Sequence, residues 1–148
     1  AYIQHLTTHM PSKLDSFGEC ARTKQDKAFV RRYGPGFKEV KYARMKQYKF
    51  VLVFQNADCD YWVDDQLSQA FDAGAVPVFM GTSLVEHLLP GRLRSGVILV
   101  RDFPSPQALA AHLLFLDGNE AAYNVYHAWR TAGVGDYSTS LVARAWDP

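Results

Sequence analysis

The hydrophobic pattern is most regular in residues 48–81, where it predicts a strand, a polar loop, a helix and a second strand. Residues 50–54 are all apolar, which is typical of a strand covered on both faces and therefore of a parallel sheet. A second apolar run, residues 76–80, follows the predicted helix at once. This βαβ order places the loop of residues 55–63 at the carboxyl end of the first strand, where open α/β sheets bind ligands.

The helix inside this unit has recognisable ends. Asp64 can cap its amino end, and Gly74 supplies the left-handed residue that ends it. Its inward stripe comprises Leu67, Ala70 and Phe71. Because these positions share one helical face, we expect them to pack on the sheet.

The residues before this unit predict two helices and one strand. Residues 1–10 carry apolar side chains at helical spacing, and Pro11 ends that helix. Residues 13–17 predict a short strand. A weakly patterned helix over residues 37–47 then leads into the central strand.

The residues after the unit continue the alternation. Residues 82–89 predict a short helix, and residues 96–100 an apolar strand. Ser105 is expected to cap the next helix, with Pro106 in its first position. The inward face of that helix comprises Leu109, Leu113 and Leu116.

Asn119 is expected to cap a last helix over residues 120–130. Its inward face is predicted to comprise Ala122, Val125, Tyr126 and Trp129. Strands that alternate with helices, without a hairpin signal, indicate an α/β fold with a Rossmann-like parallel sheet and helices on both faces. We assign residues 1–130 to this domain and residues 131–148 to a C-terminal tail. About four strands are few for such a domain, so we expect a first strand before Ala1.

Composition narrows the class of protein. The chain has 148 residues, of which 48% are apolar and 21% charged, so one folded domain is expected rather than disorder or a membrane-embedded protein. The formal net charge is only +1, with Lys and Arg spread along the chain, which argues against nucleic acid as a partner. No apolar run approaches the roughly 20 residues of a membrane helix, so any membrane contact would come through a segment outside this chain.

Signals for metal or anion binding are weak. His5 and His9 lie one helical turn apart without further ligands, so we interpret them as surface histidines and predict no metal site. Cys20 and Cys59 fit no zinc motif, which leaves one disulfide or two free thiols. Residues 19–36 are rich in Lys and Arg, which favours a solvated loop over a phosphate-binding loop.

The central stretch resembles the signature of the α-1,3-fucosyltransferases, glycosyltransferase family 10. The matching segments are YKF at 48–50, FQNA at 54–57, Cys59, YWVDDQ at 61–66 and GAVPV at 74–78, leading to Gly81 without a gap. The similarity extends back to DSFG at 15–18, with Cys20 after it, and forward through DFPSP at 102–106. It covers about residues 2–130.

The resemblance implies the C-terminal, donor-binding half of a two-domain GT-B glycosyltransferase. Such an enzyme transfers fucose from GDP-fucose to a glycan or glycoprotein acceptor with inversion. The general base belongs to the N-terminal acceptor domain, which this chain lacks, so no catalytic residue is assigned here. The resemblance implies no cofactor besides the donor substrate. It implies the Golgi lumen as location, with a type II membrane anchor outside this chain.

The resemblance also indicates which residues serve the donor. The donor-binding positions are Gln55, Asn56, Val63, Asp65 and Gln66. Arg22 and Lys24, in the loop after the preceding strand, are candidates for additional phosphate contacts. Cys20 and Cys59 both follow strands at the same sheet edge in this interpretation, which favours a disulfide in a secretory lumen.

Several of these positions depart from the family pattern. The family has glutamate at position 55 and Thr-Glu-Lys at 64–66, whereas this chain has Gln55, Asp64, Asp65 and Gln66. The triplet thus carries about two extra negative charges, and each like-charge pair at about 6 Å costs roughly 2–3 kcal/mol. Two functions therefore stay open: a divergent, working sugar-nucleotide transferase, or a degenerate, inactive domain kept as a structural or binding module. An unrelated nucleotide-binding α/β domain is a third, weaker alternative.

Overall fold

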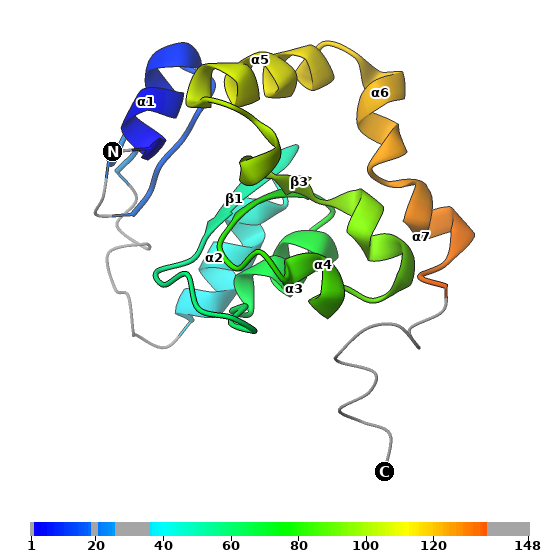
Figure 1. Cartoon of the computed structure of the whole chain (residues 1–148). Helices are drawn as coiled ribbons and strands as arrows, with labels where there is room; N and C mark the ends of the chain where they lie inside the picture. The colour runs from blue at the N-terminus through cyan, green and yellow to red at the C-terminus, as the bar shows by residue number, and fades with distance from the viewer. Residues whose placement is uncertain (1, 19–20, 26–35, 136–148) are drawn as a thin grey trace.

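The structure is a computed structural model that describes residues 2–18, 21–25 and 36–135 (Figure 1). Its centre is a parallel sheet of three strands in the order β1-β2-β3. The strands are β1 (Phe50–Phe54), β2 (Val76–Met80) and β3 (Ile98–Leu99). Among the described residues, no helix has the length and apolar character needed to cross a membrane.

Seven α-helices and two 3-10 helices surround the sheet in the described part of the chain. The α-helices are α1 (Tyr2–His9), α2 (Phe37–Met45), α3 (Gln66–Asp72), α4 (Val85–Leu88), α5 (Pro106–Asp117), α6 (Glu120–Val125) and α7 (Ala128–Ala132). The 3-10 helices are η1 (Gly91–Gly96) and η2 (Val100–Asp102).

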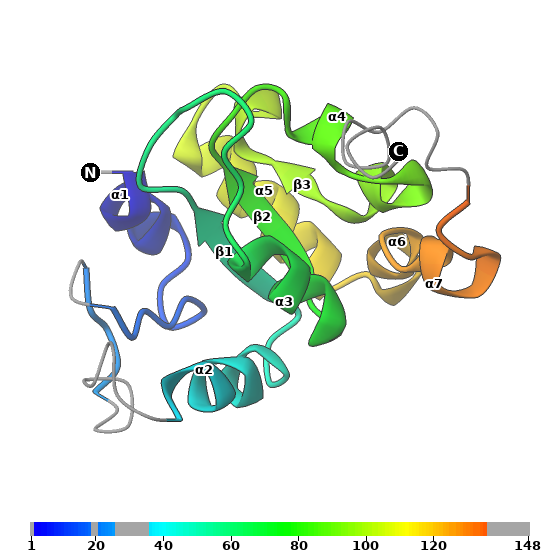
Figure 2. The same ribbon diagram turned by 90° about the horizontal axis from the view of Figure 1, so that it is seen from below.

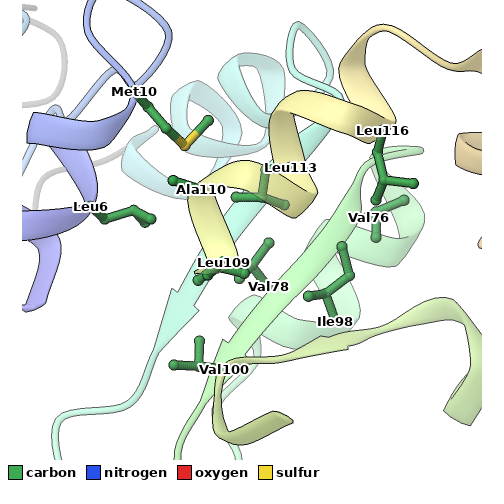
Figure 3. Close-up of a cluster of buried hydrophobic side chains, with 10 residues drawn as sticks. All are labelled: Leu6, Met10, Val76, Val78, Ile98, Val100, Leu109, Ala110, Leu113 and Leu116. Atoms are coloured by element: carbon green, nitrogen blue, oxygen red, sulfur yellow. The ribbon is translucent and has the colours of Figure 1, made fainter. Parts of the chain in front are cut away.

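Helices cover both faces of the sheet, which confirms the predicted fold class (Figure 2). On one face, α1 and α5 pack on β2 and β3 in a cluster that Figure 3 shows: Leu6, Met10, Val76, Val78, Ile98, Val100, Leu109, Ala110, Leu113 and Leu116. On the other face, α3 and α4 pack on the sheet: Val53, Leu67, Ala70, Phe71, Phe79, Val85, Leu89, Val97 and Leu99. The predicted inward stripes of α3 and α5 are confirmed, because all their members are buried.

The predicted helix ends are largely confirmed by local geometry. The Ser105 hydroxyl accepts a hydrogen bond from the Ala108 N–H at 3.1 Å, and Asn119 Oδ1 accepts one from the Ala122 N–H at 3.0 Å. Gly74 has φ +85°, the left-handed conformation expected after α3. Short-range capping rules depend only on neighbouring residues, so they hold wherever the helix packs.

The strand predicted over residues 13–17 is wrong, and the described sheet has three strands rather than four. Residues 14–17 have no regular secondary structure, and the backbone of Ser16 bonds to Thr23 and Lys24 instead. A strand needs a paired neighbour, and β1 pairs only with β2 in the described structure. The predicted strand over residues 96–100 is real but shorter, because η2 begins at Val100.

The single helix predicted over residues 120–130 is also wrong. The chain breaks after Val125 into α6 and α7, and Val125 is 65% exposed rather than inward. Tyr126 packs on the α1–α5 side of the sheet, whereas Trp129 packs on Phe71 of α3 with ring centroids 5.7 Å apart. One straight helix cannot serve both faces, so the break follows from the tertiary packing. The tail residues 136–148 lie outside the described residues.

Candidate functional site

Gln55 lies at the carboxyl edge of the sheet, directly after β1. Its N–H donates to the Met80 carbonyl at 2.8 Å, so the pairing of β1 with β2 extends one residue past the strand. Gly81 lies against it so closely that a Cβ there would come within 2.6 Å of Gln55 Cγ. A larger residue at position 81 would therefore force the Gln55 or Phe79 side chain to shift, and the absence of a Cβ lets Gln55 pack against the backbone there.

The Gln55 side chain closes the loop that leads to α3. Its Oε1 accepts a hydrogen bond from the Asp64 N–H at 3.3 Å. Its Nε2 is buried and has no acceptor within the described part of the chain. A buried donor without a partner costs about 1–3 kcal/mol, so Nε2 is available to an acceptor atom of a ligand.

The start of α3 differs from the simple capping predicted for Asp64. The helix begins at Gln66, with Asp65 in the N-cap position but without a side-chain cap bond. Asp64 Oδ1 accepts from the Gln66 N–H at 2.9 Å, and Asp64 Oδ2 accepts from Gln66 Nε2 at 2.9 Å. Asp64 therefore satisfies a first-turn N–H, and it also holds the Gln66 amide against its own carboxylate.

Two lysines of α2 face the two acids at the start of α3. Lys38 Nζ lies 3.6 Å from Asp65 Oδ2, which also accepts from Gln69 Nε2 at 2.9 Å. Lys41 is half-buried: burial lowers its pKa, while the charges of Asp65 and Asp64 act to raise it. The extra negative charge predicted at this site is thus met by two positive charges that sequence reasoning missed. Their spacing of three positions on one helix was the signal that pointed to a shared face.

The predicted phosphate contacts Arg22 and Lys24 have different surroundings. Arg22 Nε donates to the Gly18 carbonyl at 3.1 Å, and Arg22 lines a cavity of about 890 Å³ together with Lys41 and Gln66. Lys24 Nζ lies 3.7 Å from Asp15 Oδ1 and does not line that cavity. The structure therefore brings Arg22, but not Lys24, to the same space as Gln66.

Asp15, the partner of Lys24, is also the acceptor for a tyrosine. The Tyr48 hydroxyl donates to Asp15 Oδ2 at 2.8 Å. Burial, followed by this hydrogen bond and the Asp15 charge, raises the pKa of Tyr48 to about 12. Tyr48 thus stays protonated and ties the segment before β1 to residues 14–17.

The loop of residues 55–65 presents two aromatic side chains. Tyr61 and Trp62 are 63% and 56% exposed, and Tyr61 has φ +63°, an unusual backbone conformation for a non-glycine residue. Asn56 is exposed, and Val63 packs against the α3 side of the core. In the sequence these two aromatic residues belong to the family-like segment at 61–66, but no role was predicted for them.

Neither the histidines nor the cysteines form a site in the described residues. His5 and His9 are exposed on α1, which confirms them as surface histidines. No group of three His, Cys, Asp or Glu side chains that could hold a metal ion occurs within residues 2–18, 21–25 and 36–135. Cys59 is exposed, and Cys20 lies outside the described residues, so their pairing stays a prediction.

The family match and the similar proteins of known name all point to fucosyltransferases. Residues 1–144 match the family described as "Glycosyltransferase family 10 (fucosyltransferase) C-term". The human protein named GDP-fucose protein O-fucosyltransferase 3 is 31% identical over 133 residues, which cover 90% of this chain and 27% of that protein. The Xenopus laevis protein of the same name is 34% identical over 134 residues, covering 89% and 27%. This chain thus spans less than a third of the length of these relatives.

A solved structure supports the fold. The crystal structure of an alpha1,3-fucosyltransferase matches with a TM-score of 0.62, covering 84% of this chain and 32% of that one. Its sequence identity of 17% means that this match shows the fold alone. The family match spans nearly the whole chain, and it agrees with the sheet, the helices on both faces and the motif at the carboxyl edge. The chain therefore belongs to glycosyltransferase family 10, the fucosyltransferases, as the C-terminal part of such a protein.

Proposed function

We propose that this chain is the donor-binding part of an enzyme that transfers fucose from GDP-fucose, with inversion, to a hydroxyl group of a protein. The observation that supports this most is the pair Lys38 and Lys41, which face the start of α3 at the carboxyl edge of the sheet. The names of relatives that are 31–34% identical support the donor and the protein acceptor. The proposed location is the Golgi lumen, as the family resemblance implies.

The diphosphate is the part of the donor that most needs compensating charge. Lys41 and Arg22 line one cavity with Gln66, so two cations border the space beside the position where the family has lysine. A half-buried ammonium interacts more strongly with a phosphate than an exposed one, because water screens it less. Lys41 thereby takes over the charge that Gln66 lacks.

The same cations serve the chemistry of the transfer. The acceptor oxygen bonds to C1 of fucose while the bond from C1 to the phosphate oxygen breaks, and GDP leaves with the electron pair. Negative charge grows on the leaving phosphate, and fixed positive charges stabilise it most in the transition state. The proton of the acceptor hydroxyl passes to a base outside this chain. The role of these residues is therefore to hold the donor and stabilise its leaving group.

One observation favours a second candidate, a degenerate domain without transferase activity. The Gln66 side-chain amide donates to Asp64 Oδ2, and both Asp64 and Asp65 carry carboxylates beside the proposed diphosphate. If the lysines of α2 serve only to neutralise these acids, their charges cancel and Arg22 alone remains to meet the diphosphate.

Thermal unfolding of the full-length protein with GDP separates the two candidates. Binding raises the free energy of unfolding by RT ln(1 + [L]/Kd), or about 2.7 kcal/mol at a hundredfold excess over Kd. We expect GDP to raise the Tm of the wild type and to raise that of Lys41→Ala much less. The control is Lys46→Ala, because Lys46 Nζ lies over the Tyr42 ring at 4.4 Å and does not line the cavity. A wild-type Tm that does not move at millimolar GDP would support the degenerate domain.

A further inference from the structure

Two large aromatic side chains are exposed next to each other at the carboxyl edge of the sheet. Tyr61 is 63% and Trp62 56% exposed, and both belong to the stretch that joins β1 to α3. The other large apolar side chains exposed in the described part of the chain, Leu114, Phe115 and Val125, lie on α5 and α6. Contiguous exposed apolar surface marks interaction sites, and Tyr and Trp are among the residues that contribute most to binding there.

The stretch that carries the two aromatic residues is closed at its base by Gln55. The Gln55 N–H donates to the Met80 carbonyl at 2.8 Å, and Gln55 Oε1 accepts from the Asp64 N–H at 3.3 Å. Residues 56–63, the edge loop, therefore leave the sheet and return to nearly the same point, as in a compact surface loop. Figure 2 shows the edge loop projecting beyond the carboxyl ends of β1 and β2. Residues 56–62 are all exposed, so the loop is presented to solvent.

A tight turn determines which side chains lie at the tip of the edge loop. The Trp62 N–H donates to the Cys59 carbonyl at 3.1 Å, which closes a four-residue turn. Asp60 and Tyr61 are its two central residues, and Tyr61 has the positive φ of +63° that some turns require at the third position. A carboxylate and an aromatic ring thus come from neighbouring corners of one turn.

The edge loop is acidic, and its charge is not compensated locally. Residues 55–65 contain four Asp and no Lys, Arg or His. The two Asp nearest α3 have partners, the Gln66 amide and the Lys38 ammonium. Asp58 and Asp60 are exposed, and neither forms an ion pair in the part of the chain that the structure describes. Two carboxylates without a counter-charge therefore accompany the exposed rings.

The edge loop lies beside the place where the proposed transfer occurs. Tyr61 precedes Asp64 by three residues, which span at most about 11 Å. Asp64 bonds to the first turn of α3, next to the proposed position of the diphosphate. The acceptor oxygen must reach C1 of the fucose on that diphosphate, so the polypeptide around the acceptor hydroxyl passes close to the tip of the loop.

The chemistry of the tip fits a positively charged group. A guanidinium or ammonium ion can pair with the carboxylates of Asp58 and Asp60 while it lies over an aromatic ring. A neutral acceptor leaves both carboxylates without a counter-charge, whereas a cation also relieves their mutual repulsion. The donor is itself an anion, so the tip repels it. These charges favour an acceptor with a basic residue.

We propose that the edge loop is a docking surface for the acceptor polypeptide, and that it selects a Lys or Arg within about three residues of the hydroxyl that receives fucose. Asp58 and Asp60 supply the charge, and Tyr61 and Trp62 supply the aromatic surface. The inference rests on the proposed function, because it names the class of acceptor for that same reaction. These residues contact the polypeptide and not the reacting atoms.

Binding of two synthetic peptides to the full-length protein, without GDP, tests this surface. Both peptides have one Thr in a background of Gly and Ala, and they carry either Arg or Gln at the second position after the Thr. We expect the Arg peptide to bind about tenfold more tightly at low salt, and this advantage to shrink at high salt because exposed charges are screened. Equal affinity for the two peptides, or no binding of either at millimolar concentration, would overturn the inference.

Matched variants assign the preference to the edge loop. Asp58→Asn combined with Asp60→Asn should abolish the preference for the Arg peptide, whereas Glu120→Gln, which removes an exposed charge on α6, should keep it. Tyr61→Ala should weaken binding of the Arg peptide about threefold to tenfold. Phe115→Ala, which removes a similarly exposed ring on α5, should leave it unchanged. A preference that survives the loss of both carboxylates would contradict the proposal.

Chitotriose, a neutral oligosaccharide, tests for a glycan acceptor. Binding of chitotriose that Tyr61→Ala abolishes, together with equal affinities for the two peptides, would assign the edge loop to a sugar and overturn the inference. The Tm of the same protein with GDP is measured separately. If GDP does not raise the Tm, the proposed donor binding fails, while the peptide measurement still reports on the edge loop.

Discussion

Strands β1 and β2 are both five residues long and almost wholly apolar, yet they have different surroundings. β2 lies between two strands and under helices on both faces, and four of its five residues are buried. β1 has a neighbour on one side only among the described residues, and Val53 alone is buried. The degree of burial along a strand is thus decided by its position in the sheet, which a similar composition does not reveal.

The largest expected effect comes from replacing one phenylalanine in each strand, which tests the difference in burial between β1 and β2. Phe79 of β2 is 2% exposed, whereas Phe50 of β1 is half-buried. Phe79→Ala should lower the free energy of unfolding by about 3–5 kcal/mol. Phe50→Ala should cost about half as much, because less apolar surface is buried at that position. Urea denaturation measures both, and equal losses in the two variants would contradict the comparison.

The second prediction concerns the carboxyl edge that the two strands share. Gly81→Ala places a Cβ within 2.6 Å of Gln55 Cγ and 2.9 Å of Phe79 Cζ, so it should cost about 1–3 kcal/mol and displace the Gln55 side chain. Gly18→Ala is the control, since a Cβ at that position would have open space within 4 Å. An unchanged midpoint of denaturation in the Gly81 variant would show that this edge is looser than the contacts indicate.

The third prediction concerns the donor site at the end of β1. Gln66→Lys restores a cation beside Asp64 and removes the amide that Asp64 now holds. We expect GDP to bind about tenfold more tightly, equivalent to about 1.4 kcal/mol, measured by calorimetry on the full-length protein. Gln107→Lys serves as the control, because Gln107 is exposed on α5 and does not line the cavity. Equal affinities for the Gln66 variant and the wild type would remove position 66 from the donor site.

The smallest expected effect concerns a histidine on the face of the sheet that α1 and α5 cover. His112 of α5 bonds to the Tyr126 hydroxyl at 3.0 Å and packs on Phe103. Burial lowers the pKa of His112 below its ordinary value of about 6.5. The unfolded state therefore takes up a proton first, so the contribution of the neutral histidine is present above that value and is lost as the pH falls below it.

The measurement is the Tm between about pH 7.5 and pH 5.5 for the wild type and His112→Gln. The wild type should lose more stability than the variant on acidification. His127 contributes in the same direction, because burial and then the charge of Arg130 lower its pKa. An identical pH dependence in the two proteins would show that His112 is as accessible to protons when folded as when unfolded.

Features that depend on neighbouring residues could be predicted from the sequence. The caps at Ser105 and Asn119 and the left-handed Gly74 follow from local hydrogen bonding and backbone freedom, and the structure has them. The apolar runs that form β1 and β2 were also recognisable as strands, although only β2 is largely buried. These signals identified the unit that carries the candidate site.

Features that depend on distant partners could not be predicted in this way. A short strand was predicted over residues 13–17, but pairing needs a neighbour that local sequence does not specify. The break between α6 and α7 arises because Tyr126 and Trp129 pack on opposite faces of the sheet. The charge balance at Asp65 depends on Lys38, which is 27 positions earlier in the chain and meets it only through the packing of α2 on α3.

The ion pair between Lys13 and Asp117 joins residues that are 104 positions apart. Helix α1, which also packs on α5, therefore lacks this partner until the ribosome has made about a hundred further residues. At synthesis rates of about 5–20 residues per second, that wait lasts roughly 5–20 s. During this time the apolar side of α1 and the open edge of β1 are both accessible to other chains. The nascent protein should accordingly depend on chaperones until α5 has been completed.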